Sequence, residues 1–324
     1  MWLPLLAAVL GLLLLYRWYR QSQILENLTD KYVFITGCDT GFGNRLAKQL
    51  DRRGMKVLAA CLTQAGAENL KKEASSRLQT TILDVTDAGS VSSAALWVKH
   101  NVKDKGLWGL VNNAGIGIPT APNSWLHKED FVQVLNVNLL GMIDVTLHLI
   151  PLIRRARGRI INMSSVMGRL AFVGGAYCIS RFGVEAFSDS LRRELRPFGV
   201  QVCVIEPSTF KTPATDVQTT IQSLYDVWEQ APKWAKESYS QQYFQDYCRF
   251  IEYRLSKCNP HISQVTDCLE HALTAVHPWT RYSVGWITKL FYVPVSYLPT
   301  FISDYLLAHP LAKPTRSLPS QTSD

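Results

Sequence analysis

From residue 30 onward, short apolar segments alternate with amphipathic helical stretches, and this alternation constrains the fold more than any other feature. Strands separated by helices pair in parallel through right-handed crossovers. We therefore expect an α/β fold with a doubly wound parallel sheet, the Rossmann type, in a single domain. The predicted strands are Tyr32–Ile35, Lys56–Cys61, Thr80–Val85, Leu107–Asn112, Arg159–Met163 and Gln201–Ile205.

The rest of the chain is organised around this core. We predict a hydrophobic signal anchor at 1–20, a dinucleotide-binding and catalytic core at 30–212, helices that cover the substrate at 213–310 in the same domain, and a disordered tail at 311–324. The aromatic residues between 225 and 253 have helical spacing, which is more typical of packing than of individual substrate contacts, so none is assigned to substrate. Prolines interrupt the apolar segment 291–308, which is too broken to span a membrane; core packing and shallow membrane contact are the two alternatives, and we favour core packing.

The N-terminal segment is read as an uncleaved anchor. Residues 2–16 carry no charge, and Arg17 and Arg20 follow directly. A cleavable signal peptide would have its positive charge before the apolar run and small residues at a cleavage site. The positive-inside rule then places the catalytic domain on the cytosolic side, in contact with membrane lipid.

Charge and cysteine content exclude other classes. The chain has 34 Lys and Arg against 26 Asp and Glu, a net charge of +8, but no long basic run interleaved with aromatic residues, so no nucleic-acid partner is expected. The seven cysteines are scattered and form no CxxC pair. This pattern argues against a disulfide framework and against a structural metal, so we expect no metal site.

A glycine-rich turn follows the first strand. It reads Thr36-Gly37-Cys38-Asp39-Thr40-Gly41-Phe42-Gly43 and leads into a helix. Three glycines at such a place let the backbone turn tightly, approach a pyrophosphate and present helix N-terminal amides to it. The turn therefore predicts a dinucleotide site, with a plain tight turn as the alternative.

The spacing Gly-x-x-x-Gly-x-Gly resembles that of the short-chain dehydrogenase/reductase family, and further motifs agree with it. They are Asn112-Asn113-Ala114-Gly115, Asn138 within 136–141, Ser164-Ser165, Tyr177-Cys178-Ile179-Ser180-Arg181, Pro207 and Thr212. Nearly the whole chain is similar to the microsomal retinol/3α-hydroxysteroid dehydrogenase branch. That resemblance implies an enzyme of the endoplasmic reticulum membrane that acts on a retinoid or steroid alcohol or ketone and that can form a homodimer.

The resemblance implies a role for four residues. Tyr177 would take the hydroxyl proton as a base; the phenol of a free tyrosine has a pKa near ~10, so this chemistry needs a nearby cation. Ser165 would hydrogen-bond the substrate oxygen, with Ser164 as the alternative. Asn138 would hold a proton relay, or else be a satisfied amide inside a helix. Arg181 would supply the cation.

The resemblance also implies which residues bind the dinucleotide. They are Thr36, Gly37, Asp39, Gly41, Phe42, Gly43, Asp84, Asn112, Ala114, Gly115, Tyr177, Arg181, Pro207 and Thr212. Asp39 would repel a 2′-phosphate, which favours NAD over NADP. Asp84 either accepts from the adenine amine or is a turn aspartate.

Two positions depart from the family pattern. Arg181 stands where the family has lysine, and a guanidinium is larger, planar and always charged. Ser208 stands where glycine is usual, and its Cβ would be strained if the backbone there had a positive φ. We expect an oxidoreductase that transfers hydride between NAD and a hydrophobic alcohol, retinol or a 3α- or 17β-hydroxysteroid. The alternative is a nucleotide-binding protein with little or no activity.

Overall fold

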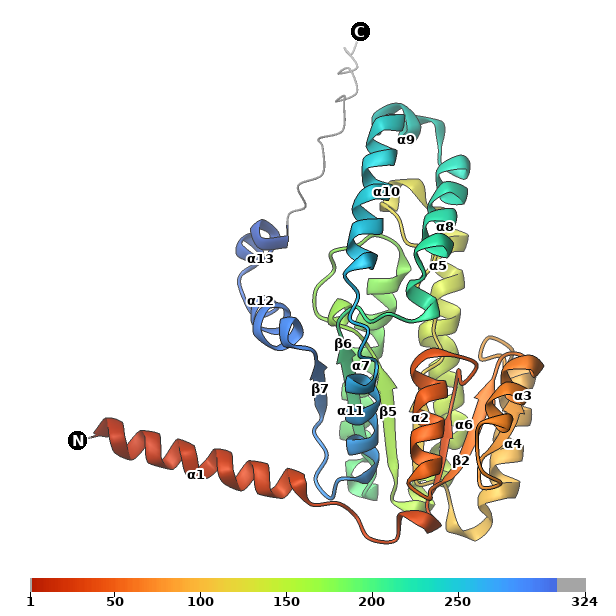
Figure 1. The fold of residues 1–324 in the computed structure, drawn as a ribbon, viewed down its shortest axis with the longest axis vertical. Coiled ribbons are helices and arrows are strands. Elements are labelled where there is room, and N and C mark those ends of the chain that lie inside the picture. The colour runs from red at the N-terminus through yellow and green to blue at the C-terminus, as the bar shows by residue number, and fades with distance from the viewer. Residues whose placement is uncertain (1, 308–324) are drawn as a thin grey trace.

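The structure, a computed structural model, describes residues 2–307 and contains a seven-stranded sheet in which all neighbouring strands are parallel (Figure 1). The strand order is β3-β2-β1-β4-β5-β6-β7. The strands are β1 (Tyr32–Ile35), β2 (Lys56–Cys61), β3 (Gln79–Ile82), β4 (Gly109–Asn112), β5 (Arg159–Met163), β6 (Gln201–Pro207) and β7 (Arg281–Val284). The predicted doubly wound sheet is confirmed. Its order reverses between β1 and β4, where such sheets bind ligands beyond the carboxyl ends of their strands.

The sequence located six of these strands but not the seventh. The bounds of β1, β2 and β5 are as predicted, whereas β3 ends at Ile82 rather than at Val85. The reason is a turn at Asp84, whose Oδ1 accepts a 2.8 Å hydrogen bond from the Thr86 amide. Strand β7 pairs with β6 through four residues. It lies at the edge of the sheet and buries only Tyr282 and Val284, so it lacks the continuous apolar run that marks the central strands.

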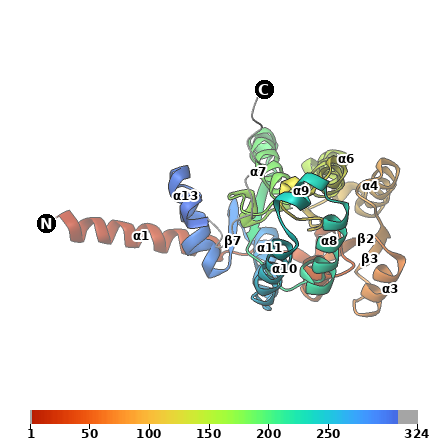
Figure 2. The same cartoon turned by 90° about the horizontal axis from the view of Figure 1, so that it is seen from above.

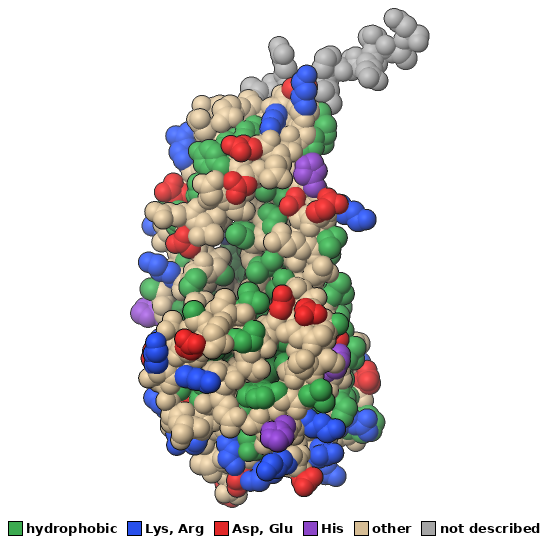
Figure 3. Space-filling model, turned by 90° about the vertical axis from the view of Figure 1, so that its right-hand side faces the viewer, with side chains coloured by type: hydrophobic (Ala, Val, Ile, Leu, Met, Phe, Trp, Pro, Cys, Tyr) green, Lys and Arg blue, Asp and Glu red, His purple; other side chains and the backbone are tan. Residues whose placement is uncertain are grey.

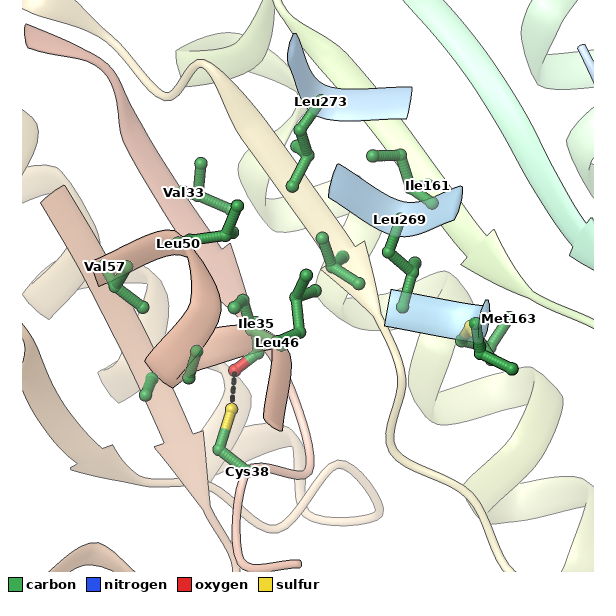
Figure 4. Close-up of a cluster of buried hydrophobic side chains, with 14 of the residues drawn as sticks. Val33, Ile35, Cys38, Leu46, Leu50, Val57, Ile161, Met163, Leu269 and Leu273 are labelled. Atoms are coloured by element: carbon green, nitrogen blue, oxygen red, sulfur yellow. Dashed lines mark hydrogen bonds between the residues drawn. The ribbon is translucent and has the colours of Figure 1, made fainter. Parts of the chain in front are cut away.

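Helices cover both faces of the sheet and bury two layers of apolar side chains. On one face lie α2 (Gly41–Arg52), α3 (Gln64–Lys72) and α11 (Ser263–Thr274), the last close to the predicted helix at 262–276. On the other lie α4 (Ala88–Val102), α6 (Met142–Ala156) and α7 (Ala176–Leu195). Figure 4 shows the first layer, in which Leu46, Leu50 and Leu269 pack against Val33 and Ile161. The alternation of strand side chains between the two faces accounts for both layers.

A group of helices stands at one end of the sheet (Figure 1): α8 (Val217–Gln230), α9 (Lys233–Ser238) and α10 (Gln241–Ser256). Much of the aromatic content of this region forms its own small core. Trp125 is fully buried there, with ring centroids 4.7 Å from Trp228 and 5.4 Å from Tyr247. Packing is therefore the role of most of these aromatic residues.

A long apolar helical run belongs to the core. Within residues 2–307, the run 128–156 is long and apolar enough to cross a membrane, but 44% of its apolar stretch is buried inside the protein. It consists of α5 (Lys128–Leu135), the π-helical turn η4 (Asn136–Gly141) and α6. Leu149 and Ile153 pack against the sheet, so the core explains its composition.

The two ends of the described chain are the least buried parts. Helix α1 (Trp2–Ser22) projects away from the sheet, with Leu6, Leu10 and Leu14 exposed (Figures 1 and 2). The C-terminal part contains the π-helical turn η8 (Thr288–Tyr292), α12 (Val293–Val295) and α13 (Thr300–Leu307).

The favoured expectation, that 291–308 packs in the core, holds for Val295, which is 4% exposed, but is wrong for most of the large side chains of its described part. Tyr297, Phe301 and Tyr305 are 74%, 75% and 82% exposed. Prolines 294 and 299 divide the segment into short pieces, which cannot present one continuous apolar face to the sheet. The predicted tail at 311–324 lies outside the described residues.

Candidate active site

A cavity of about 740 Å³ lies at the carboxyl ends of the central strands, and most of the predicted site residues line it. The volume is in the range of small-molecule and cofactor sites. Of the residues assigned above, the lining includes Gly37, Asp39, Gly41, Phe42, Asp84, Ala114, Gly115, Ser165, Tyr177, Arg181, Pro207 and Thr212. Thr36, Gly43, Asn112 and Asn138 are not among the lining residues, and their contacts show what they do instead.

The glycine turn has the geometry that a pyrophosphate needs. Gly37 and Gly41 have φ values of +70° and +63°, which side chains rarely adopt. A Cβ on Gly43 would lie 2.4 Å from the Gly37 carbonyl oxygen, so glycine is required for this close approach. Helix α2 begins at Gly41, and the side chain of Thr40 makes no capping hydrogen bond to it. The first amides of α2 are therefore not satisfied by a cap, and the turn fits a dinucleotide phosphate group.

Thr36 and Asn113 join the glycine turn to the loop after β4. Thr36 is 2% exposed, and its Oγ1 accepts 3.0 Å hydrogen bonds from the amides of Asn113 and Ala114. Asn113 donates from Nδ2 to the carbonyls of Thr36 (2.9 Å) and Gly37 (3.0 Å). Thr36 thus holds two loops of the site together. Asn113 joins the same two loops through its own side chain. It belongs to the motif at 112–115, but the sequence predicts no role for it.

Asn112 lies beneath the cavity, inside the sheet. It is 3% exposed and donates to Thr146 Oγ1 (2.8 Å) and Asn162 Oδ1 (2.9 Å). These bonds connect β4, α6 and β5. Its side chain therefore stabilises the framework below the site.

The two acidic residues of the cavity are both held in place by neighbouring groups. Asp39 accepts hydrogen bonds from the amides of Leu62 (2.7 Å) and Thr63 (2.9 Å), directly after β2. Its carboxylate therefore lies beside the carboxyl end of β2, at the wall of the cavity. Asp84 makes the turn contact with Thr86 described above, so its turn role is present while it also lines the cavity.

Tyr177 and Arg181 lie one turn apart on α7. Arg181 is 7% exposed, and its guanidinium carbon lies 4.9 Å from the centre of the Tyr177 ring. Its Nη1 donates a 2.8 Å hydrogen bond to the Met163 carbonyl at the end of β5. A Cβ on Gly115 would approach Arg181 Nη2 to 2.9 Å, so the missing side chain at 115 makes room for the guanidinium. The larger cation is accommodated beside the tyrosine.

The two serines after β5 point to different partners. Ser165 is 6% exposed, lines the cavity, accepts from the Met167 amide (3.2 Å) and donates to the Pro207 carbonyl (3.3 Å). Ser164 Oγ donates to the Arg181 carbonyl (3.4 Å), inside α7. Ser164 lines the cavity as well, so both serines stand at its wall, and the choice of Ser165 stays a prediction.

Asn138 fixes the backbone beside the site. It is 1% exposed in η4, where its Oδ1 accepts from the Ile116 amide (2.8 Å) and its Nδ2 donates to the Ile116 carbonyl (2.9 Å) and to Ser180 Oγ (3.1 Å). All these partners are protein groups. Asn138 is therefore a positioning residue that connects the loop after β4 to α7.

The loop after β6 tolerates its unusual serine. Among the described non-glycine residues, positive φ values occur at Asn27, Lys103 and Arg157 only, so Ser208 is not strained. Its amide donates to the Val284 carbonyl (3.4 Å) on β7. The crowding expected from the Ser208 Cβ would require a positive φ at that residue, and the backbone there does not have one.

One side of the cavity is apolar. Met167, Phe172 and Val173 line it below, and Phe250, Ile251 and Leu255 of α10 line it above, together with the guanidinium-bearing Arg254. Of the aromatic residues predicted to cover the substrate, Phe250 is the one that reaches the lining. The cavity thus joins a polar half around the glycine turn to an apolar half under α10.

A buried ionic cluster supports the loops from behind. Glu206, fully buried on β6, binds Arg169 Nε at 2.7 Å and Arg281 Nε at 3.3 Å. Arg281 also binds Glu185 at 2.9 Å. Burial, and then the charge of Glu206, raise the pKa of the Glu185 carboxyl above its usual range. The cluster holds β6 in place next to Pro207. Because Glu206 is fully buried, removal of one member of the cluster should lower the stability of the fold.

The cysteines near the glycine turn are inert. Cys38 and Cys61 are fully buried. Burial raises the pKa of the Cys61 thiol to about 12 and that of Cys38 well above its ordinary value. Neither thiol is ionised at neutral pH, so they behave as small apolar residues.

Comparisons with known proteins agree with this geometry. Residues 31–222 match the family model described as short chain dehydrogenase. Retinol dehydrogenase 16 of Homo sapiens is 57% identical over 318 residues, which are 98% of this chain and 100% of that protein. 17-beta-hydroxysteroid dehydrogenase type 6 of Homo sapiens is 53% identical over the same shares. A short chain dehydrogenase/reductase from Burkholderia phymatum, solved in complex with NAD, has a TM-score of 0.67 at 18% identity, covering 91% of this chain and 100% of that chain.

Proposed function

This chain belongs to the short-chain dehydrogenase/reductase family of NAD(P)-dependent oxidoreductases, and we propose that it transfers hydride between NAD and a hydrophobic alcohol. The relatives that match its whole length are named for retinol and for 17β-hydroxysteroids, and these are the two substrate classes we carry over. One observation carries the proposal: a single cavity joins the glycine turn, Tyr177 and Ser165 to an apolar half under α10.

The preference for NAD rests on Asp39. Two backbone amides after β2 hold its carboxylate at the cavity wall. An acidic group after β2 accepts from the adenine-ribose 2′-hydroxyl of NAD and repels the 2′-phosphate of NADP. Asp39 would serve that purpose from the glycine turn.

The chemistry follows from the side chains around the apolar half. When bound, the nicotinamide supplies the acceptor for the hydride that leaves the alcohol carbon. Ser165 would hold the substrate oxygen, and Tyr177 would remove its proton. Asn138 hydrogen-bonds to both Ile116 and Ser180 and so holds the loop after β4 against α7.

Arg181 supplies the positive charge that a phenolate base needs. The guanidinium lies close to the Tyr177 ring and is held by the Met163 carbonyl. A fixed charge at this distance stabilises the deprotonated base in place of the family's lysine. The alternative, a protein that binds the nucleotide without turnover, has no support from the relatives, which carry enzyme names.

The N-terminal helix would anchor the enzyme in the endoplasmic reticulum membrane, with the catalytic domain on the cytosolic side. Helix α1 has 21 residues. Its uncharged part, residues 2–16, extends roughly 22 Å, and Trp18 and Tyr19 continue the helix into the interface, where aromatic side chains are favoured. Arg17 and Arg20 would lie at its cytosolic end.

The test is NADH formation by the detergent-solubilised protein with all-trans-retinol and with 5α-androstane-3α,17β-diol, a steroid that carries both a 3α- and a 17β-hydroxyl. Wild type, Tyr177→Phe and Tyr253→Phe are compared, since Tyr253 is an exposed tyrosine of α10 and serves as the matched control. We expect turnover by wild type and by the control, and a loss of about 10²- to 10⁴-fold in Tyr177→Phe. A wild type that binds NAD but oxidises neither alcohol would contradict the proposed substrates; an unimpaired Tyr177→Phe would contradict the base.

A further inference from the structure

The exposed apolar residues between 286 and 306 form a surface that we call the C-terminal patch. Trp286, Leu290, Tyr297, Phe301 and Tyr305 are all between 72% and 82% exposed. Single exposed apolar side chains are ordinary on a protein surface, but a contiguous segment of large ones indicates a binding surface. The face turned away from α1 differs: charged side chains are spread over it among hydrophobic ones (Figure 3).

The composition of the C-terminal patch is that of a membrane interface. Between 286 and 306 the only charged residues are Lys289 and Asp304. Tryptophan and tyrosine are enriched at the level of lipid headgroups, because one end of each ring is apolar and the other is polar. Lys289 is exposed and makes no ion pair with another described residue, so it is free to meet an anionic phosphate.

The C-terminal patch lies on the same side of the molecule as α1 (Figures 1 and 2). The base of α1 is attached next to β7: Arg20 lies 3.2 Å from His277 Nδ1, and Ile24 forms a β-bridge with Ala275. The C-terminal patch begins directly after β7. An anchor formed by α1 would therefore bring the C-terminal patch to the same bilayer surface.

The inner side of this segment touches the wall of the cavity. Tyr292 stacks on Phe172 with ring centroids 5.4 Å apart and an interplanar angle of 7°, and Phe172 lines the cavity. Tyr297 accepts a 3.0 Å hydrogen bond from Arg169, which binds the buried Glu206 of β6. The apolar surface and the apolar half of the cavity are thus neighbours.

We propose that the C-terminal patch rests in the headgroup region of a lipid bilayer and borders the route by which a hydrophobic substrate passes from the membrane into the cavity. Its prolines prevent a span, so the contact is shallow and parallel to the surface. The contact turns the apolar half of the cavity toward the lipid. The part that concerns substrate entry rests on the proposed function; the membrane contact does not.

The contact is tested on the full chain with an environment-sensitive fluorophore (NBD) attached at Phe301→Cys and, as control, at Leu96→Cys, an exposed residue of α4. The native cysteines are buried or half-buried, and the unsubstituted chain measures their background labelling. In phosphatidylcholine–phosphatidylserine vesicles we expect a blue-shifted emission at 301, quenched several-fold more by doxyl-labelled lipid than at 96. Equal quenching at both sites refutes the contact. The contact is also refuted if the probe at 301 is shielded from both lipid and aqueous quenchers and if this shielding increases with the density of protein on the vesicles. That result would show that a second copy of the chain covers the C-terminal patch.

The route is tested by kinetics with the double variant Phe301→Ser/Tyr305→Ser. The matched control is Leu96→Ser/Leu147→Ser, which changes two exposed leucines of α4 and α6 that do not line the cavity. With retinol delivered in vesicles we expect the patch variant to raise KM several-fold, and with retinol in detergent to leave KM and kcat unchanged. If the patch variant has the same KM as the wild type with retinol in vesicles, the route is refuted. If the wild type shows no turnover, the proposed function fails while the fluorescence result still decides the membrane contact.

Discussion

Replacing Arg181 by methionine removes the cation beside the proposed base while keeping a flexible stem in its place. The guanidinium carbon lies 4.9 Å from the centre of the Tyr177 ring, and the side chain is 7% exposed. If the phenolate charge is placed at the ring centre, two opposite unit charges 4.9 Å apart interact with about 3.4 kcal/mol at an effective dielectric constant of about 20. A loss of that size in the transition state lowers the rate up to about 300-fold.

The expected loss comes from the charge of the side chain rather than from its volume, so another cation at position 181 should substitute for arginine. Arg181→Lys keeps the charge and should remain within about tenfold of wild type, since it loses only the planar hydrogen-bonding geometry.

The assay is kcat for NADH formation from 5α-androstane-3α,17β-diol at saturating NAD and pH 7, with NAD affinity measured separately by intrinsic fluorescence. Arg193→Met is the matched control, because Arg193 is an exposed guanidinium of the same helix. An Arg181→Met protein that binds NAD and keeps the wild-type kcat at pH 7 refutes the reasoning. A loss of NAD binding that accounts for the whole loss of rate refutes it too, since the guanidinium would then hold the cofactor rather than support the base.

Three further predictions concern stability and cofactor choice. Trp125→Ala should lower the free energy of unfolding in urea by about 3–5 kcal/mol, because the ring is fully buried among aromatic neighbours. Trp125→Phe should lower it by less, because the buried indole nitrogen makes no hydrogen bond with a described residue that the change could remove. Equal losses in the two variants would contradict this. Glu206→Gln should lower the free energy of unfolding by about 3–5 kcal/mol, because it removes a fully buried carboxylate from two half-buried arginines, and Glu185→Gln should lower it less. The pKa of Glu185 is raised in the folded protein, so its charged form disfavours folding. As the pH rises above 4.5, the free energy of unfolding of wild type should therefore fall relative to that of Glu185→Gln. A rise would contradict this prediction. Asp39→Ser should shift the ratio of the Kd values for NADP and NAD by at least about tenfold in favour of NADP, and an unchanged ratio would show that Asp39 does not select the cofactor.

The candidate site was predictable where short motifs carry its chemistry. The glycine turn, Tyr177, Ser165 and Arg181 come together at one cavity, as their order along the chain implied. Thr36 and Asn112 were assigned to the cofactor, but their side chains bind other parts of the protein. A motif identifies a position, whereas the partner of a side chain depends on which loop packs beside it.

The local pattern of the chain by itself determined the parallel sheet, the faces of its helices and the glycines of the turn. These features depend on side-chain periodicity and on backbone angles, which act within a few neighbouring residues. Only the tertiary structure decided that Asp39 is held by the amides after β2, that Asn138 clamps Ile116, and that the segment after β7 is exposed. Each of these depends on segments distant in sequence, as in the hydrogen bond between Arg169 and Tyr297, 128 residues apart. Such contacts form when packed layers bring the segments together, and no local pattern contains that information.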